Sequence, residues 1–165
     1  MAHFPDDSNF LHGRLDWAIL QNGWSSLYCK EDILEKDLSW FRDSGFTLIE
    51  LDCSGWSSTV IIHASLSTAL DFPDYYGNNW DALNDCLSGV PIPEEGLVVV
   101  LRHFDQMQRE WGQTIADIFA GNSRRKLLFG RKLILLIQVD NRSFELSKVG
   151  GCPVLWNGRE FFIRK

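Results

Sequence analysis

Two aspartates one helical turn apart, Asp81 and Asp85, are the residues of this sequence whose type and spacing best suit chemistry with a partner. On an α-helix they would share one face with Asn84 and Ser88, because these positions follow i, i+3, i+4 and i+7 spacing. The opposite face would carry Ala82, Leu83, Cys86 and Leu87. Such a helix is anchored by its apolar side and displays an acidic side without any basic residue.

This acidic face has two interpretations, a solvated surface or a binding surface. Asp81 in the first helical turn would gain about 0.3–1 kcal/mol from the helix dipole without any partner. Asp85 is harder to explain, because it repeats the charge of Asp81 at i+4, which costs roughly 0.2–0.5 kcal/mol. The neighbouring Tyr75, Tyr76 and Trp80 favour binding, because aromatic side chains are enriched at interfaces. Composition alone leaves both interpretations open.

Residues 71–89, DFPDYYGNNWDALNDCLSG, resemble the signature of the barstar family, intracellular inhibitors of secreted guanyl-specific ribonucleases. In that family a PxYYGxNxDALxDCLxG pattern builds a binding loop and helix. The matching positions are Pro73, Tyr75, Tyr76, Gly77, Asn79, Asp81, Ala82, Leu83, Asp85, Cys86, Leu87 and Gly89. The order strand, helix, binding helix, strand, helix, strand over about residues 46–139 is also that of the family.

By this resemblance, Asp85 would enter the phosphate-binding pocket of a nuclease, and Asp81 would pair with neighbouring basic groups. A carboxylate can imitate phosphate among the Arg, Lys and His side chains of such a site. The other partner-binding residues would be Tyr75, Gly77, Asn79, Trp80, Asn84, Ser88 and Gly89.

The partner that the resemblance implies is a protein, a secreted guanyl-specific-type ribonuclease or a related toxin. It would be held in a 1:1 complex with its basic active site occluded by the acidic helix. The resemblance implies no catalytic residue, metal or cofactor in this chain, and neither nucleic acid nor a membrane is an expected partner.

Three features depart from the family pattern. Asn84 and Val90 stand where the resemblance leads us to expect aromatic residues. The segment 117–126, where further acidic contacts are expected, ends instead in GNSRRK. Either this second contact is absent, or the partner differs from the known nucleases.

The elements that must position these residues form an α/β pattern. Apolar runs predict strands at 46–53, 96–104 and 132–139, and the first is apolar and β-branched enough for a central strand. Helical periodicity predicts helices at 31–45 and 59–70, the second with an N-cap at Ser57-Ser58. It predicts two more, one at about 79–89 with Asn78 or Asn79 as its N-cap, and one that starts at residue 111 and breaks around Gly121-Asn122. This alternation predicts a small central parallel sheet flanked by helices.

Both ends of the chain extend beyond this core. Residues 1–14 read as a flexible leader, and residues 15–165 as a single domain whose family core is about 46–139. Asn22-Gly23 predicts an N-terminal hairpin, because Asn-Gly is a strong two-residue turn signal. The same dipeptide at Asn157-Gly158 predicts a terminal hairpin or an added edge strand.

Composition narrows the class of protein. Hydrophobic residues make up 45% and charged residues 23%, as in ordinary globular proteins. No apolar stretch approaches the roughly 20 residues of a membrane helix, and the N-terminal residues lack a signal-peptide pattern. We therefore expect a cytoplasmic protein. In that reducing compartment its four cysteines would be free thiols. Residues 1–95 carry four basic against 16 acidic residues, an imbalance that would steer cationic partners.

Three other functions stay open at this stage. The basic run RRKLLFGRK, residues 124–132, could contact the phosphates of a nucleic acid. The fold could also serve as a scaffold or regulatory module that inhibits no nuclease. An enzyme is the third, but His63 and His103 lie in no catalytic or metal-binding motif, and an exposed pair of aspartates lacks a pocket that would separate their pKa values.

Overall fold

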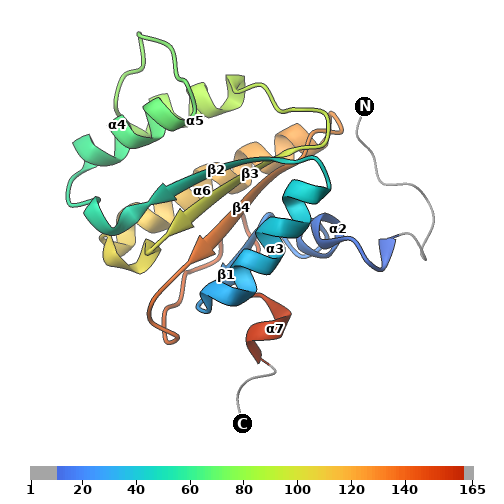
Figure 1. Cartoon of the computed structure of the whole chain (residues 1–165). Coiled ribbons are helices and arrows are strands. Elements are labelled where there is room, and N and C mark those ends of the chain that lie inside the picture. Colours follow the sequence, from blue (N-terminus) through green and yellow to red (C-terminus); the bar gives the residue numbers. More distant parts are fainter. Residues whose placement is uncertain (1–10, 162–165) are drawn as a thin grey trace.

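The computed structural model describes residues 11–161 and has a five-stranded parallel sheet with the strand order β2-β3-β4-β1-β5 (Figure 1). The strands are β1 (Ser25–Tyr28), β2 (Thr47–Asp52), β3 (Leu97–Arg102), β4 (Leu133–Gln138) and β5 (Leu155–Trp156). The helices are α2 (Leu15–Leu20), α3 (Glu31–Asp43), α4 (Thr59–Ala69), α5 (Trp80–Gly89), α6 (Arg109–Leu127) and α7 (Gly158–Phe161). The predicted α/β class is confirmed, whereas most of the predicted leader lies outside the described residues.

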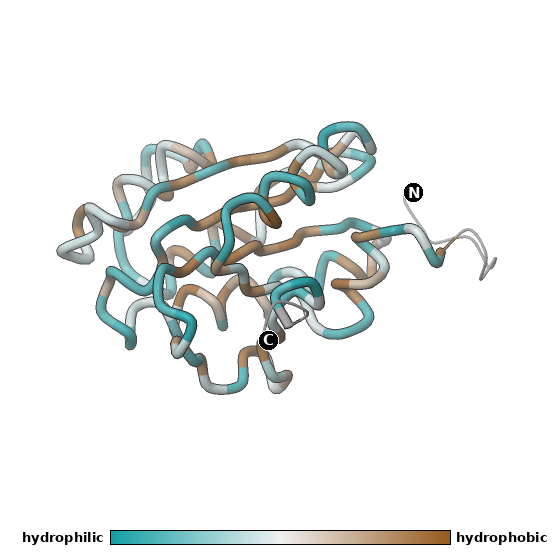
Figure 2. Tube along the Cα trace, turned by 60° about the horizontal axis from the view of Figure 1, so that its bottom comes forward, coloured by the Kyte–Doolittle hydropathy of each residue, from teal (hydrophilic) through white to brown (hydrophobic). Residues whose placement is uncertain are grey.

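Helices cover both faces of the sheet, and α3 and α6 lie on opposite sides of it (Figure 1). Successive side chains of a strand point to opposite faces. In β3, Val99 packs in the cluster formed with α4, α5 and α6, whereas Val98 and Val100 pack in the cluster formed with α2 and α3. The central strands are apolar on both faces for this reason, and Figure 2 shows them as hydrophobic segments between helices of mixed hydropathy.

The central position predicted for residues 46–53 is wrong, because β2 lies at the edge of the sheet. Its run of apolar residues is interrupted by Glu50, which is half exposed and pairs with Arg102 of β3 at 2.9 Å and Arg42 of α3 at 3.1 Å. An edge strand can present such a charge to solvent, whereas the uninterrupted apolar runs of β3 and β4 occupy the interior.

The hairpin predicted at Asn22-Gly23 is also wrong. The preceding residues form α2, and the chain then turns through Gly23, at φ +123°, into β1, which runs parallel to β4. Asn22 donates its side-chain amide to the carbonyl of Ala18 at 2.9 Å, which closes the end of the helix. The dipeptide therefore makes a turn between a helix and a strand, and α2 buries Ile19 against the sheet.

At the other end of the chain, the added edge strand is confirmed and the hairpin is not. β5 pairs with β1, and Asn157 then begins α7 by accepting a hydrogen bond from the backbone N–H of Arg159 at 3.0 Å. The side-chain amide of Asn157 also donates to the buried carboxylate of Asp37 at 2.8 Å. The tail is thereby fixed to α3, which belongs to the N-terminal extension.

The break predicted at Gly121-Asn122 is wrong, because α6 continues through it to Leu127. Glycine inside a helix costs about 1 kcal/mol relative to alanine, and the burial of Phe119 in the core offsets this. Asn122 is buried and donates to the carbonyl of Ile118 at 2.9 Å and to the side chain of Asn84 at 3.1 Å.

Within residues 11–161, no helix is both long and apolar enough to cross a membrane.

Candidate protein-binding surface

Helix α5 is fixed at its N-terminus and along its apolar side. Of the two predicted caps, Asn79 is the one used: its side-chain oxygen accepts a hydrogen bond from the N–H of Ala82 at 2.8 Å. Its side-chain nitrogen donates to the carbonyl of Gly77 at 3.3 Å, so the cap also holds the preceding loop. Leu83 and Leu87 are fully buried in the core. The polar face of α5 is therefore presented by a rigid element.

The acidic face that the spacing predicts is present on α5. Asp81, Asp85 and Ser88 are exposed, and Asn84 between them is half buried. In the described part of the chain, the structure gives neither Asp81 nor Asp85 an ion pair. Glu50 on β2, by contrast, pairs with two arginines. The two carboxylates on α5 thus remain available to a cationic partner.

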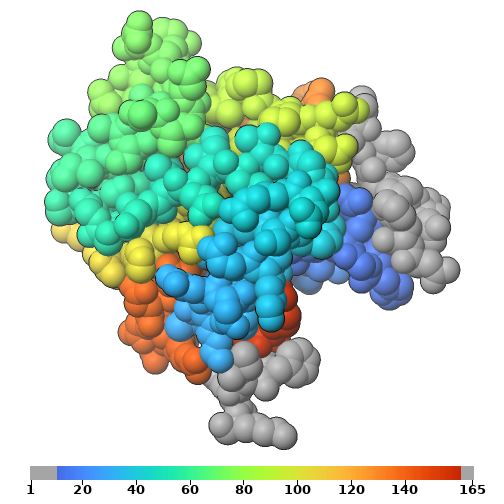
Figure 3. Space-filling view, in the orientation of Figure 1, coloured from blue at the N-terminus to red at the C-terminus, as the bar shows by residue number. Residues whose placement is uncertain are grey.

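The loop between α4 and α5 protrudes from the molecule (Figures 1 and 3). Its two tyrosines point in different directions, with 85% of Tyr75 exposed and only 7% of Tyr76. The Tyr76 hydroxyl lies 2.5 Å from the Nδ1 atom of His63, and the ring of Trp80 lies 4.7 Å from the His63 ring. Burial raises the pKa of Tyr76 to about 12 and lowers the pKa of His63, so both groups are neutral near pH 7. His63 thus holds the loop, and Tyr75 is displayed.

A hollow of about 220 Å³ separates Asp85 from the protruding loop. Tyr75, Gly89 and Asp71 line it together with Asp85, so a third carboxylate lies close to the predicted site. We did not predict Asp71 as a site residue. Its position at the start of the acidic segment 71–89 was the available signal, but its proximity to Asp85 depends on how the loop folds back.

The Asn84 side chain forms hydrogen bonds within the protein that connect α5 to α6. Its side-chain oxygen accepts hydrogen bonds from Arg125 at 3.0 Å and from Asn122 at 3.1 Å. Lys126 donates to the carbonyl of Ser88 at 3.0 Å and to that of Val90 at 2.8 Å. A cation at the C-terminus of a helix is favoured by the helix dipole. Partial burial also lowers the pKa of Lys126.

These contacts weaken the nucleic-acid interpretation of residues 124–132. Arg125 and Lys126 bind α5, and buried Lys132 forms an ion pair with Asp16 at 3.0 Å. Three of the five basic side chains in this segment are thus engaged within the protein. Arg125 and Lys126 thereby support the acidic helix.

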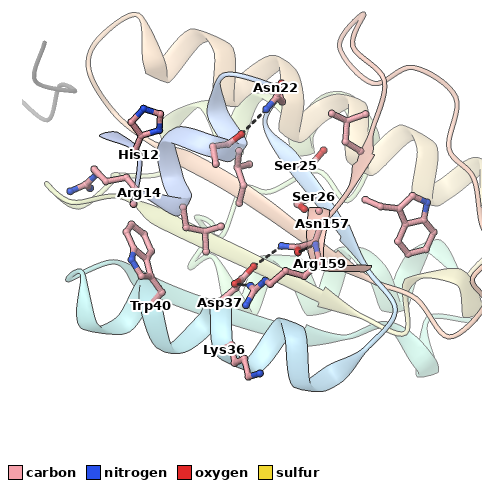
Figure 4. Close-up of a pocket in the computed structure, with 17 residues that line it drawn as sticks. His12, Arg14, Asn22, Ser25, Ser26, Lys36, Asp37, Trp40, Asn157 and Arg159 are labelled. Atoms are coloured by element: carbon pink, nitrogen blue, oxygen red, sulfur yellow. Dashed lines mark hydrogen bonds and ion pairs between the residues drawn. The ribbon is translucent and has the colours of Figure 1, made fainter. Parts of the chain in front are cut away.

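A larger hollow of about 700 Å³ lies between α2, α3 and β5, on the other face of the sheet from α5 (Figure 4). Its most buried polar group is the carboxylate of Asp37. Asn157 and Tyr28 donate to that carboxylate at 2.8 and 2.6 Å, and Arg159 forms an ion pair with it. These bonds join the two ends of the chain, which gives this carboxylate a structural role.

Residues 46–132 match the family model described as "Barstar (barnase inhibitor)". The matched range includes α5 and the loop before it. The chain is 45% identical over 71 residues to the "Putative ribonuclease inhibitor YrdF" of Bacillus subtilis (strain 168), across 42% of this chain and 75% of that protein.

A structural match was found in the structure of Drosophila ORC bound to AT-rich DNA and Cdc6. The TM-score is 0.46 and the identity 19%, over 76% of this chain and 43% of the other. A likeness at this level carries no argument about function.

Proposed function

The chain belongs to the barstar family of non-enzymatic ribonuclease inhibitors, and we propose that it acts by inserting the acidic face of α5 into the basic active site of its ribonuclease. The observation that carries this proposal is the exposure of Asp81 and Asp85 on a capped and anchored helix, where the described residues supply no ion-pair partner to either. A nuclease site that binds phosphate would supply the missing cations.

In the proposed complex, Asp85 is the central anchor and Asp81 pairs with basic groups beside it. Around them lie Tyr75, Gly77, Asn79, Trp80, Asn84, Ser88 and Gly89. Their contributions differ in kind: Asn79 and Trp80 hold the loop and helix in place, Asn84 positions Arg125, and Tyr75 offers an exposed aromatic side chain. The partner is a secreted guanyl-specific ribonuclease bound 1:1.

Rigidity and charge both favour this mode of binding. A helix that is already ordered loses little conformational entropy on association, which leaves more of the contact energy as affinity. Segment 71–89 contains four aspartates and no Lys or Arg, so its field accelerates encounter with a cationic cleft.

Calorimetric titration into a purified secreted guanyl-specific ribonuclease tests the proposal. We expect Asp85→Ala to cost at least about 2 kcal/mol of binding free energy, as interface hot spots do. Asp43→Ala is the matched control, because Asp43 is exposed at the end of α3, on the other face of the sheet. Absence of both heat and inhibition for the wild-type protein at micromolar concentration would reject the proposal.

A further inference from the structure

Two large apolar side chains, Leu128 and Phe129, are exposed just after α6. Their exposed fractions are 81% and 73%. The turn that carries them is defined: Gly130, at φ +68°, donates its N–H to the carbonyl of Leu127 at 2.9 Å, and the N–H of Arg131 reaches the carbonyl of Lys126 at 3.0 Å. Apolar side chains held out in this way offer surface whose burial against another molecule is favourable.

A hollow of about 360 Å³ opens beside Phe129. Apolar and basic side chains from the end of α5 and the end of α6 meet there. The lining residues are Ser88, Val90, Ile92, Asn122, Arg125, Lys126, Phe129 and Arg131. A ligand for this surface must therefore combine apolar atoms with negative charge.

One cation of the hollow, Arg131, has no side-chain partner among the described residues. Lys126 is held by the carbonyls of Ser88 and Val90, and Arg125 by the side chains of Asn84 and Asn122. For the Arg131 guanidinium, the structure gives no hydrogen bond or ion pair to any residue between 11 and 161. A carboxylate arriving at the hollow would meet this free donor.

The hollow is continuous with the acidic face. Ser88 lines the hollow and lies on the same exposed face of α5 as Asp85, and Arg125 reaches that face through Asn84. A protein large enough to cover Asp85 would extend over the neighbouring turn. The combined surface is acidic at the start of α5 and apolar and basic at its end.

We propose that Phe129, Arg131 and the 360 Å³ hollow form a second docking surface for the same protein partner. It receives a partner segment that carries an acidic side chain beside an apolar one. The apolar group covers Phe129, and the carboxylate pairs with Arg131. This inference rests on the proposed function and adds a selection rule: the preferred ribonuclease has an acidic, apolar rim next to its basic active site.

The test is a calorimetric titration of the full chain against a panel of purified secreted guanyl-specific ribonucleases, followed by variants against the tightest binder. We expect Phe129→Ser and Arg131→Glu each to weaken binding about tenfold. Arg142→Glu makes the same charge change beyond the opposite end of β4 and should leave binding unchanged. Because both tested side chains lie outside the core, the urea midpoints should match the wild type.

Each other outcome overturns the inference in a distinguishable way. Unchanged binding by Phe129→Ser and Arg131→Glu, with binding still lost in Asp85→Ala, rejects the second docking surface and keeps the proposed function. Tighter binding by Arg131→Glu shows a basic partner segment. In a separate filter-binding assay with RNA, loss of RNA binding by Arg131→Glu with nuclease binding intact would assign the surface to nucleic acid. If no nuclease of the panel binds the wild type, the proposed function and the inference fail together.

Discussion

Arg125 donates a hydrogen bond of 3.0 Å to the side-chain oxygen of Asn84, which places a cation at the edge of an otherwise acidic helix face. This contact joins two departures from the family pattern, an amide at position 84 and basic residues near the end of α6. Asn84 and Arg125 are the acceptor and the donor of one hydrogen bond between α5 and α6. A change at one position therefore alters the surroundings of the other.

Asn84→Ala and Arg125→Met should each lower the free energy of unfolding by about 1 kcal/mol, since each removes a hydrogen bond at the same oxygen. The double variant should lose less than the sum of the two, by about 0.5 kcal/mol or more. Urea denaturation measures all three values. Arg124→Met, an exposed neighbour on α6, is the control and should change little. Strict additivity would show that the two side chains do not cooperate.

The parts of the fold that sequence patterns predict are those fixed by local chemistry. The Asn79 cap and the two faces of α5 follow from residues within one or two helical turns of each other. The edge position of β2 and the continuity of α6 do not, because they depend on distant contacts. Asn122 is stable inside α6 partly through Asn84, which lies on another helix.

In the candidate site, too, local patterns predict some features and distant contacts decide others. Asp81 and Asp85 were predicted to share an exposed face, and they do. The neighbouring Tyr75 and Tyr76 look equivalent in the sequence, yet one is displayed and the other is buried against His63. Only the position of α4 decides between them, and no local pattern encodes that position.

Lys126→Met should loosen the end of α5. The change removes hydrogen bonds to the carbonyls of Ser88 and Val90 and the cation that complements the helix dipole, so we expect a loss of about 1–2 kcal/mol in unfolding free energy. Hydrogen exchange should accelerate in the last turn of α5 and not in α3. Lys36→Met, at an exposed position of α3, provides the control. Unaltered exchange in α5 would contradict the capping role of Lys126.

Lys132→Met should be the most damaging single change of those considered. Asp16 is fully buried between Lys132 at 3.0 Å and Arg14 at 2.9 Å. Burial alone would raise the pKa of Asp16, but hydrogen bonds from Arg14 and Lys132 hold it below its ordinary value. Removing one cation from a buried pair costs about 3–5 kcal/mol, and the remaining Arg14 places the expected loss near the lower end.

Urea denaturation checks this value, with Arg131→Met as the adjacent control, because Arg131 forms no ion pair with any residue between 11 and 161. A loss below about 1 kcal/mol for Lys132→Met would mean that Arg14 alone satisfies Asp16. The comparison also measures how strongly α2, which lies outside the family match, is coupled to the start of β4.

The pH dependence of stability should separate two histidines with opposite shifts. Burial lowers the pKa of His63, so the unfolded chain takes up a proton before the folded one does. Its contribution to stability is therefore complete above the unfolded pKa of about 6.5 and declines as the pH falls below that value. Protonation would also make the Nδ1 atom of His63 a donor, so the Tyr76 hydroxyl could then only accept in this contact.

His103 should act in the opposite sense. The hydrogen bond with Asp140, 3.0 Å away, raises the pKa of His103, so its contribution is complete below about pH 6.5 and is lost as the pH rises through the higher folded value. Urea denaturation of two variants from pH 5 to pH 9 distinguishes the contributions of the two histidines to stability. Asparagine suits the left-handed backbone of position 103, at φ +54°. In His103→Asn, only the loss of stability at low pH should therefore remain. In His63→Gln only the loss at high pH should remain, and the reverse result would show that the two shifts are wrongly assigned.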